Sequence, residues 1–246
     1  MSRDIVELYR RLPVTAADEW WVQRAAASSD GRVLYLGCGT GRLALPIAAA
    51  CSLLVGVDVD PGMLEAFAAR VGEELTGRVD LVRASARELD LGDRFGLVVL
   101  PSNLLNGIVD PAERAQVVHA AADHCREDGQ VVMQVLNPYW MAARRGSGAG
   151  VLEPRGPDGE RVEVGIEQIT FDPWEQRQRA TLVYRFPDGR ELIDHIDAVA
   201  LYPRELRALA YGAGLEISQR LGSDPRSDLL GRDGGTWHLV CGRRVD

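Results

Sequence analysis

The stretch Val33-Leu34-Tyr35-Leu36-Gly37-Cys38-Gly39-Thr40-Gly41-Arg42 decides the fold of this chain. Its apolar first half has the length and composition of a short buried strand, and the alanine- and leucine-rich segment 43–50 that follows is typical of a helix. A glycine-rich turn joins the two. In open α/β sheets a nucleotide-like ligand binds at such a turn, because glycine lets the backbone approach the ligand without a Cβ in the way.

Alternation of strand and helix continues beyond this stretch. An apolar run over 53–57 ends at Asp58, and Pro61 stands where proline favours the first turn of a helix. Further strands are predicted at 79–82, 97–100, 131–136, 215–221 and 236–241, and further helices at 111–125 and 203–213. We therefore predict an α/β fold of the Rossmann-like kind, a seven-stranded, mostly parallel sheet with an antiparallel last strand and helices on both faces.

Two segments interrupt this alternation. The first is the amino-terminal segment, residues 1–30. Its apolar residues have helical spacing and predict two short helices, one ending at Pro13 and one capped by Thr15. After Asn137 the apolar period changes to two, which predicts a loop over 146–159 and then a three-stranded antiparallel meander. The predicted parts are a helical cap (1–30), a sheet core (31–137 and 201–246) and an antiparallel β lid inserted after the fifth strand (138–200).

Composition and charge exclude several kinds of protein. The 246 residues carry 28 basic against 36 acidic side chains, a net charge of −8, so a polyanion such as nucleic acid is repelled at long range. Every basic residue is an arginine, which excludes the Walker A phosphate loop, the pyridoxal Schiff base and the lysine general base. No apolar run approaches the ~20 residues that a membrane helix requires.

The spacing of the cysteines indicates whether they bind a metal and in which kind of compartment the protein resides. Cys38, Cys51, Cys125 and Cys241 lie far apart without a C-x-x-C pair, so the sequence predicts free thiols and no metal site. Free thiols are typical of a reducing compartment. The expectation is a soluble cytoplasmic protein with no membrane and no nucleic acid as partner, and self-association into a homo-oligomer is compatible with the sequence.

Spacing within the glycine turn separates two classes of cofactor. Dinucleotide sites favour G-x-G-x-x-G/A, whose third small residue lets helix and strand pack closely, but here Arg42 occupies that place and the pattern is G-x-G-x-G. Asp58 follows Gly37 by 21 residues, close to the ~20 at which an acid accepts hydrogen bonds from ribose hydroxyls. The sequence therefore has the acid expected to bind a ribose, but its glycine spacing differs from that of dinucleotide sites.

Segments 33–42 and 56–64 resemble two cofactor motifs of the class I S-adenosylmethionine-dependent methyltransferases, and the resemblance covers about 31–137 and 201–246. It implies that S-adenosylmethionine is the cofactor. By position it also implies contacts from Gly37, Cys38 and Gly39 to the methionine and ribose, from Asp58 to both ribose hydroxyls, from Val59 and Met63 to the adenine, from Ser85 and Ala86 to the adenine amino group, from Pro101 and Asn103 to the methionine end, and from Tyr9 as a cover.

Two positions depart from the family pattern. Ser85 stands where the family often has an acid at the adenine, and its hydroxyl can still accept a hydrogen bond from an amino group. Tyr35 stands two residues before the first glycine, where the family has an acid that helps to hold the cationic methionine end. Either another acid substitutes, or affinity is low, or the cofactor is a variant of the usual one.

The predicted lid bears on the methyl acceptor. Small-molecule members of the family, such as glycine N-methyltransferase and antibiotic-sugar N-methyltransferases, place antiparallel strands at the same point. The resemblance implies that Asn137, Tyr139 and Trp140 face the acceptor. An amine acceptor needs only an unprotonated lone pair, whereas a hydroxyl acceptor benefits from a general base, for which His195 is the candidate.

Three functions are open at this point. The first is methyl transfer by in-line displacement to a nitrogen or oxygen atom of a small molecule, for which the protein aligns the nucleophile and excludes water. The second is methylation of RNA or protein, of which the acidity disfavours RNA. The third is a catalytically silent relative that binds a cofactor or partner, a reading to which Tyr35 and Ser85 point.

Overall fold

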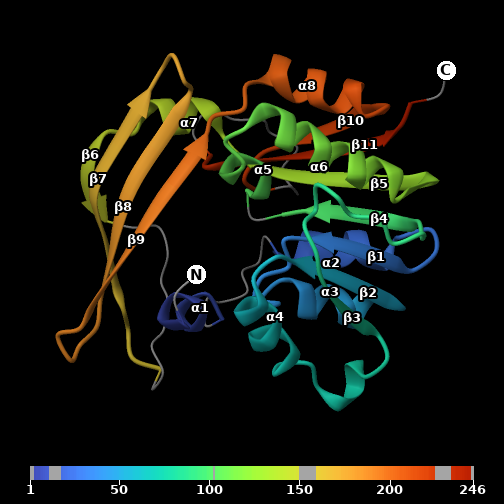
Figure 1. The fold of residues 1–246 in the computed structure, drawn as a ribbon, viewed down its shortest axis with the longest axis horizontal. Coiled ribbons are helices and arrows are strands. Elements are labelled where there is room, and N and C mark those ends of the chain that lie inside the picture. Colours follow the sequence, from blue (N-terminus) through green and yellow to red (C-terminus); the bar gives the residue numbers. More distant parts are fainter. Residues whose placement is uncertain (1–2, 11–17, 102, 150–158, 225–233, 245–246) are drawn as a thin grey trace.

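The computed structural model describes residues 3–10, 18–101, 103–149, 159–224 and 234–244. A seven-stranded sheet, in the order β10-β11-β5-β4-β1-β2-β3, lies beside a four-stranded sheet, in the order β6-β7-β8-β9 (Figure 1). The strands of the larger sheet are β1 (Arg32–Leu36), β2 (Leu53–Asp58), β3 (Val79–Arg83), β4 (Phe95–Leu100), β5 (Cys125–Leu136), β10 (Leu215–Leu221) and β11 (Thr236–Arg243).

Pairing in the larger sheet confirms the predicted fold class. β1 is parallel to β2 and β4, β2 is parallel to β3, and β4 is parallel to β5. β11 runs antiparallel to both of its neighbours, β5 and β10. The carboxyl ends of β1, β2, β4 and β5 therefore meet at one edge of the sheet, which is where an open α/β sheet binds its ligand.

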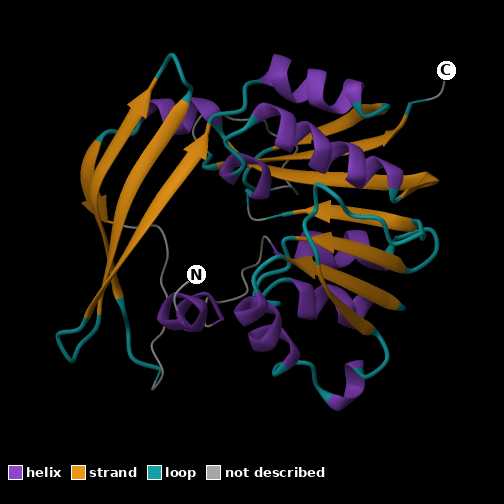
Figure 2. Cartoon of the chain, in the orientation of Figure 1, coloured by secondary structure: helices purple, strands orange, loops and turns teal. Residues whose placement is uncertain are grey.

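Helices cover both faces of this sheet (Figure 2). Trp21, Ile47 and Phe67 from α2, α3 and α4 pack on one face, and Val117 and Leu206 from α6 and α8 pack on the other. All six residues of β4 are buried, as expected for a central strand with both faces covered. The helices are α1 (Arg3–Arg10), α2 (Glu19–Ala26), α3 (Ala44–Ala50), α4 (Pro61–Ala68), α5 (Leu104–Gly107), α6 (Pro111–Asp123), α7 (Pro138–Ala143) and α8 (Pro203–Gly212), with a 3₁₀ turn at Glu73–Leu75.

Three of the helices begin with the same local device. Asp60, Asp110 and Asn137 each precede a proline, and each side chain accepts hydrogen bonds from two backbone N–H groups of the first turn. Proline has no N–H to satisfy and its φ is already helical, so the cap and the proline together fix where the helix starts.

The start of α2 differs from the sequence-based prediction. Thr15 lies outside the described residues, and the residue before α2 is Asp18, whose side chain makes no capping hydrogen bond. The Asp18 carboxylate instead accepts a hydrogen bond from Arg42 at 2.8 Å. The acid therefore ties the helix to the glycine turn.

The described part of the lid has four strands, where the sequence predicted three. They are β6 (Gly146–Ala149), β7 (Glu163–Asp172), β8 (Arg177–Arg185) and β9 (Glu191–Val199). The predicted loop was wrong at its start, because β6 pairs antiparallel with β7, and the helix α7, which precedes β6, was not predicted at all. Glycine, serine and alanine give β6 no alternation of large apolar side chains, so its sequence carried no strand signal.

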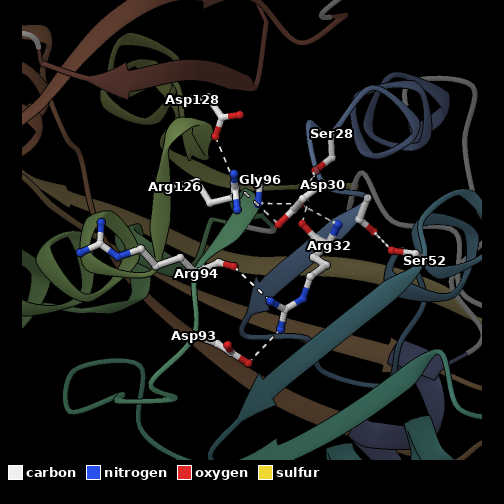
Figure 3. Close-up of polar contacts among 10 residues, drawn as sticks. Ser28, Asp30, Arg32, Ser52, Asp93, Arg94, Gly96, Arg126 and Asp128 are labelled. Atoms are coloured by element: carbon white, nitrogen blue, oxygen red, sulfur yellow. Dashed lines mark hydrogen bonds and ion pairs between the residues drawn. The ribbon is translucent and has the colours of Figure 1, made fainter.

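Polar contacts hold the amino ends of the core strands, opposite the ligand edge (Figure 3). One oxygen of Asp30 accepts hydrogen bonds from the backbone N–H groups of Arg32 and Gly96, both at 2.9 Å. The Arg32 guanidinium forms an ion pair with Asp93 at 2.8 Å. These contacts tie the start of β1 to the start of β4, which leaves the other edge of the sheet to build a site.

Candidate functional site

A cavity of about 610 Å³ lies at the carboxyl edge of the large sheet, between the core and the lid. Its walls come from the turn after β1, the ends of β2, β4 and β5, helix α1 and the last part of β9. Helix α1 lies between the four-stranded sheet and α4 (Figure 1), where Leu8 and Tyr9 pack against the lid. The cavity therefore requires cap, core and lid together.

The glycine turn forms the floor of this cavity. The backbone N–H groups of Gly37 and Cys38 both donate to the carbonyl of Val57, at 2.8 and 3.0 Å, which fixes the turn against β2. A Cβ built on Gly39 meets nothing closer than the Met63 sulfur at 4.0 Å, so the space above this residue is open. An adenosyl group can approach the backbone there at close range.

Asp58 is held in place by the backbone around it. One carboxylate oxygen accepts from the N–H of Gly39 at 2.8 Å, and the other accepts from the N–H of Asp60 at 3.0 Å. Each oxygen keeps a second lone pair, so the oriented carboxylate can accept two further hydrogen bonds. A vicinal pair of ribose hydroxyls supplies two such donors.

Two arginines lie at the glycine turn, and each is held by a polar contact. Arg70 donates to the carbonyl of Thr40 at 2.9 Å, and Arg42 is fixed by Asp18. Arg42 is the one basic residue among the described residues that line the cavity. An anionic group bound in the cavity therefore finds its countercharge at the start of α3.

Thiol chemistry is suppressed in this site. All four cysteines of the chain are free and buried. Burial, and then the nearby Asp58 carboxylate, raise the pKa of the Cys38 thiol far above its ordinary value. Cys38 therefore lines the cavity as a neutral thiol, which is a poor nucleophile at neutral pH.

The end of the cavity beyond β4 carries amide groups. Asn103 has a left-handed backbone, with φ of 61°, and its side-chain oxygen is buried without a hydrogen-bond partner among the described residues. Asn106 is fully engaged, since its NH₂ donates to the carbonyl of Val199 at 2.7 Å and its oxygen accepts from the N–H of Leu136 at 2.8 Å. A strained residue with an unsatisfied buried acceptor is a common mark of a binding site.

Most of the predicted cofactor residues line the cavity. They are Tyr9, Gly37, Cys38, Gly39, Asp58, Met63, Pro101 and Asn103. Val59, Ser85 and Ala86 do not form its wall: Val59 is 62% exposed beside it, and the Ser85 hydroxyl accepts from the backbone N–H and the guanidinium of Arg87, both at 3.3 Å. The residues predicted to contact the ribose and the methionine thus line one cavity. Of those predicted to contact the adenine, only Met63 lines it.

The predicted acceptor residues lie outside this cavity. Asn137 is fully buried, caps α7 and donates to the carbonyl of Gly234 at 2.7 Å, which gives it a structural role. Tyr139 packs edge to face on Tyr202, and Trp140 lies under the guanidinium of Arg144. Sequence position places these residues just after β5, but α7 turns them away from the cavity wall.

His195 does not line this cavity either, so its role as a general base stays a prediction. It pairs across the lid with Thr181, whose hydroxyl is 3.4 Å from its ring nitrogen, and its side chain is exposed. The three residues that follow it on β9, Ile196, Asp197 and Ala198, line the cavity. Period-two patterning predicted the strand but gave no indication of which part of it lies at the cavity.

The sequence did not predict several residues of the wall, among them Asn106, Gln134, Leu136, Ile196, Asp197 and Ala198. One of them had a visible signal, because Gln134 is polar within the otherwise apolar run Val131–Leu136. Asp197 forms an ion pair with Arg177, which lowers the pKa of its carboxyl group. It is therefore a charged partner of arginine rather than a base poised near neutral pH.

One phenol, that of Tyr9, lines the cavity, and that of Tyr184 lies next to it. Burial, and then the charge of Asp194, raise the pKa of Tyr9 above its ordinary value, and burial likewise raises the pKa of its neighbour Tyr184. Both hydroxyl groups stay protonated at neutral pH. Tyr9 can therefore present a neutral O–H to the cavity.

Known proteins match both the sequence and the fold. Residues 33–129 match a family described as a methyltransferase domain. The cypemycin N-terminal methyltransferase of Streptomyces sp is 27% identical over 77% of this chain and 74% of that protein. Among solved structures, the CcbJ methyltransferase from Streptomyces caelestis has a TM-score of 0.78 at 25% identity, covering 95% of this chain and 91% of that chain. CalS10, an amino pentose methyltransferase from Micromonospora echinaspora solved with bound S-adenosylmethionine, has a TM-score of 0.68 at 24% identity over 91% of this chain and 89% of that chain.

Other curated relatives match over shorter stretches. The matches cover 44%, 40% and 51% of the length of three of them, the last two being ubiquinone biosynthesis O-methyltransferases. The family match agrees with the glycine turn, the fixed Asp58 and the strand order. The chain therefore matches a methyltransferase domain over residues 33–129, and it has the fold of S-adenosylmethionine-dependent methyltransferases, which use S-adenosylmethionine as their cofactor.

No helix in the described part of the chain is both long and apolar enough to cross a membrane. Within the same residues, no group of three or more histidine, cysteine, aspartate or glutamate side chains is placed to hold a metal ion.

Proposed function

We propose that this protein transfers the methyl group of S-adenosylmethionine to a nitrogen atom of a small molecule that carries an amine. The cofactor supplies an electrophilic methyl group on a sulfonium, with a neutral thioether as the leaving group. The residues of this chain have to hold the adenosine, hold the methionine end, and leave one open approach in line with the carbon–sulfur bond.

The adenosine is held at the β2 side of the cavity. Asp58 is oriented by two backbone N–H groups and accepts from the two ribose hydroxyls, while Gly39 leaves room for the sugar. Met63 lines the wall beyond, and the exposed Val59 offers an apolar surface that the adenine ring covers. The fixed Asp58 carboxylate beside open space at Gly39 is the observation that carries this proposal.

The methionine end lies toward β4 and β5, because the cavity extends in that direction from Asp58. Arg42 supplies the cation for the α-carboxylate, and Asp18 holds its guanidinium in place. The unsatisfied buried oxygen of Asn103 accepts a hydrogen bond at the same end. These groups fit a zwitterion and give a neutral ligand no comparable binding.

Absence of a suitable base in the described wall favours nitrogen over oxygen as the acceptor atom. Cys38 is a neutral thiol, Asp197 is paired with arginine, and Asp58 is committed to the ribose. An amine needs only its lone pair, whereas a hydroxyl needs a group that takes its proton. The relative that is covered to 74% is an N-terminal methyltransferase, which supports the same choice, whereas the two O-methyltransferases are covered to only 40% and 51%.

Calorimetry with S-adenosylhomocysteine tests cofactor binding. We expect Asp58→Ala to weaken binding by about 1–3 kcal/mol, the usual effect of leaving two buried hydroxyls without their acceptor. Asp80→Ala removes an exposed carboxylate from the neighbouring strand β3 and serves as the matched control, with unchanged affinity. If the two variants bind alike, Asp58 has no part in holding the ribose.

Acceptor class is tested by methyl transfer from labelled S-adenosylmethionine to matched pairs of sugars and small peptides. Each pair has an amine in one member and a hydroxyl in the other. Transfer to the amines alone agrees with the proposal. Transfer to the hydroxyl members at comparable rates would overturn the choice of nitrogen.

A further inference from the structure

A carboxylate lies on the apolar inner face of the lid. Strand β9 alternates between exposed and half-buried side chains over 191–196, which places Leu192, Asp194 and Ile196 on the face that packs against helix α1. Leu192 and Ile196 belong to an apolar cluster with their neighbours on β7, β8 and α1. Asp194 lies between them, directly opposite the buried Leu182 of β8. A negative charge therefore lies within an apolar part of the lid.

This carboxylate has no cationic partner in the described part of the chain. Asp194 forms neither a hydrogen bond nor an ion pair there, whereas Asp197 of the same strand binds Arg177. Holding a half-buried carboxylate among apolar side chains without a partner costs free energy. A bound cation would offset this cost, so the position of Asp194 suits a ligand that carries a positive charge.

Two neutral phenols lie beside Asp194. Tyr9 of α1 packs against the same apolar cluster as Tyr184 of β8. Burial, and then the charge of Asp194, raise the pKa of Tyr9, and the same charge adds to the effects of burial and of Tyr9 on the pKa of Tyr184. The Tyr184 hydroxyl is buried without a well-aligned hydrogen-bond partner among the described residues. A carboxylate next to aromatic rings is a typical environment for a bound ammonium group.

The cavity between core and lid extends to this part of the lid. Tyr9 and Ile196 both line it. Asp194 precedes Ile196 by two residues on the same face, which corresponds to roughly 7 Å along a strand. The carboxylate therefore lies just beyond the cavity wall. A ligand that is bound in the cavity can extend along the lid to Asp194.

The group that contacts Asp194 cannot be the nitrogen that takes the methyl group. A carboxylate stabilises the protonated form of an amine in contact with it, and a protonated amine has no lone pair. In the transfer the N–C bond forms as the C–S bond of the sulfonium breaks, the electron pair stays on sulfur, and the nitrogen then releases its proton to water. Asp194 therefore suits a second nitrogen group, which keeps its charge throughout.

We propose that Asp194 binds a second, positively charged nitrogen group of the methyl acceptor, so that the protein acts on small molecules with two amines. This inference rests on the proposed function and narrows its acceptor from amines to diamines. One amine offers its lone pair to the methyl group inside the cavity, and the other stays protonated at Asp194. Asp194 thus determines specificity and takes no part in the bond changes.

Matched amines test this role. The probes are α,ω-diaminoalkanes of increasing length and the alkylamines of the same lengths, with labelled S-adenosylmethionine. We expect the native protein to methylate at least one diamine with a KM about tenfold below that of its alkylamine, the usual effect of one charge-assisted hydrogen bond. Asp194→Asn keeps the shape and removes the charge, so it should raise the KM of that diamine about tenfold while its kcat changes little. Glu163→Gln makes the same change at an exposed position of β7 and should keep the native KM values.

Calorimetry of the same amines with the protein saturated by S-adenosylhomocysteine measures acceptor binding without turnover. The diamine should bind about tenfold more tightly than its alkylamine to the native protein and equally tightly to Asp194→Asn. If the native protein binds S-adenosylhomocysteine but neither prefers nor methylates any diamine, the inference is overturned and the cofactor site stands. If it does not bind S-adenosylhomocysteine, the proposed function fails, and this inference falls with it.

A second variant separates ligand binding from a role in the fold. Asp194→Leu completes the apolar face, so it should raise the Tm and also abolish the preference for diamines. A lower Tm would mean that the carboxylate stabilises the fold, which contradicts the proposal. In the described part of the lid β9 is an edge strand, and inward charges can protect such edges from association. If Asp194→Leu self-associates but keeps the native preference for diamines, Asp194 protects the edge and binds no acceptor.

Discussion

Gly41 lies where the glycine turn meets α4, and its backbone φ is +75°. A Cβ at this residue comes within 2.3–2.6 Å of ring carbons of Phe67, which is fully buried. The glycine turn and α4 therefore pack through a contact that only glycine permits. The third glycine of the motif serves packing, while the space above Gly39 serves the ligand.

Gly41→Ala should destabilise the protein by about 2–4 kcal/mol, from left-handed strain of about 1 kcal/mol and overpacking of about 1–3 kcal/mol. Gly77→Ala is a matched control, since its φ is +76° and a Cβ there meets nothing within 4 Å. Because Gly77→Ala introduces only the left-handed backbone strain, it should lower the free energy of unfolding by about 1 kcal/mol. Urea unfolding of both variants measures the difference, and equal losses would contradict the packing argument.

His238 should make stability depend on pH. Its pKa in the folded protein is lowered by burial, so between the folded value and the ordinary value of about 6.5 the unfolded chain binds more protons. Stability should therefore be full above about pH 6.5 and fall as the pH is lowered below it. Unfolding free energies between pH 5 and 8 should show a shallower slope in His238→Gln than in the native protein. Identical slopes would remove His238 as the source.

Element boundaries follow from local chemistry where caps and apolar runs exist. Asp60-Pro61 and Asp110-Pro111 set helix starts that sequence reasoning found, and the apolar run at β4 was found because both of its faces are covered. β6 was missed because glycine, serine and alanine carry no pattern, and its pairing is supplied by the backbone of β7. The local sequence can predict that a helix or strand forms, whereas the strand with which it pairs lies in another part of the chain.

The aspartates at the two ends of α6 have opposite expected effects. Asp110 caps the first turn by accepting from Ala112 and Glu113, so Asp110→Ala should cost about 1 kcal/mol. Asp123 is the last residue of the same helix and is exposed, where a negative charge opposes the helix dipole. Asp123→Ala should be neutral or slightly stabilising in thermal unfolding. A loss at Asp123 as large as at Asp110 would contradict the capping role.

At the scale of the molecule, the site is built from three parts that sequence reasoning placed without orienting them. Tyr9 of the cap, Asp58 of the core and Ile196 of the lid meet at one cavity, although the segments lie far apart in the chain. Patterning located each element, but the face that the lid turns inward depends on how the two sheets pack. His195 was therefore selected by residue type alone, whereas most of the predicted cofactor residues of the core line the cavity.

A ligand that touches several parts should stabilise their assembly. At a concentration of 100 times its Kd, S-adenosylhomocysteine should add about 2.7 kcal/mol to the free energy of unfolding. Thermal unfolding should show a rise in Tm that grows with ligand concentration. Asp58→Ala should reduce the rise at any fixed concentration, and homocysteine alone should produce none. A Tm that is indifferent to the ligand would contradict the assignment of the cavity.

The neutral Cys38 thiol on the cavity floor also constrains how inhibitors of this protein could be designed. Electrophilic warheads rely on a thiolate or a free amine, and this cavity offers a thiol held in its protonated form within a chain that contains no lysine. Reversible compounds directed at the cavity would gain affinity from the carboxylate of Asp58 and the guanidinium of Arg42.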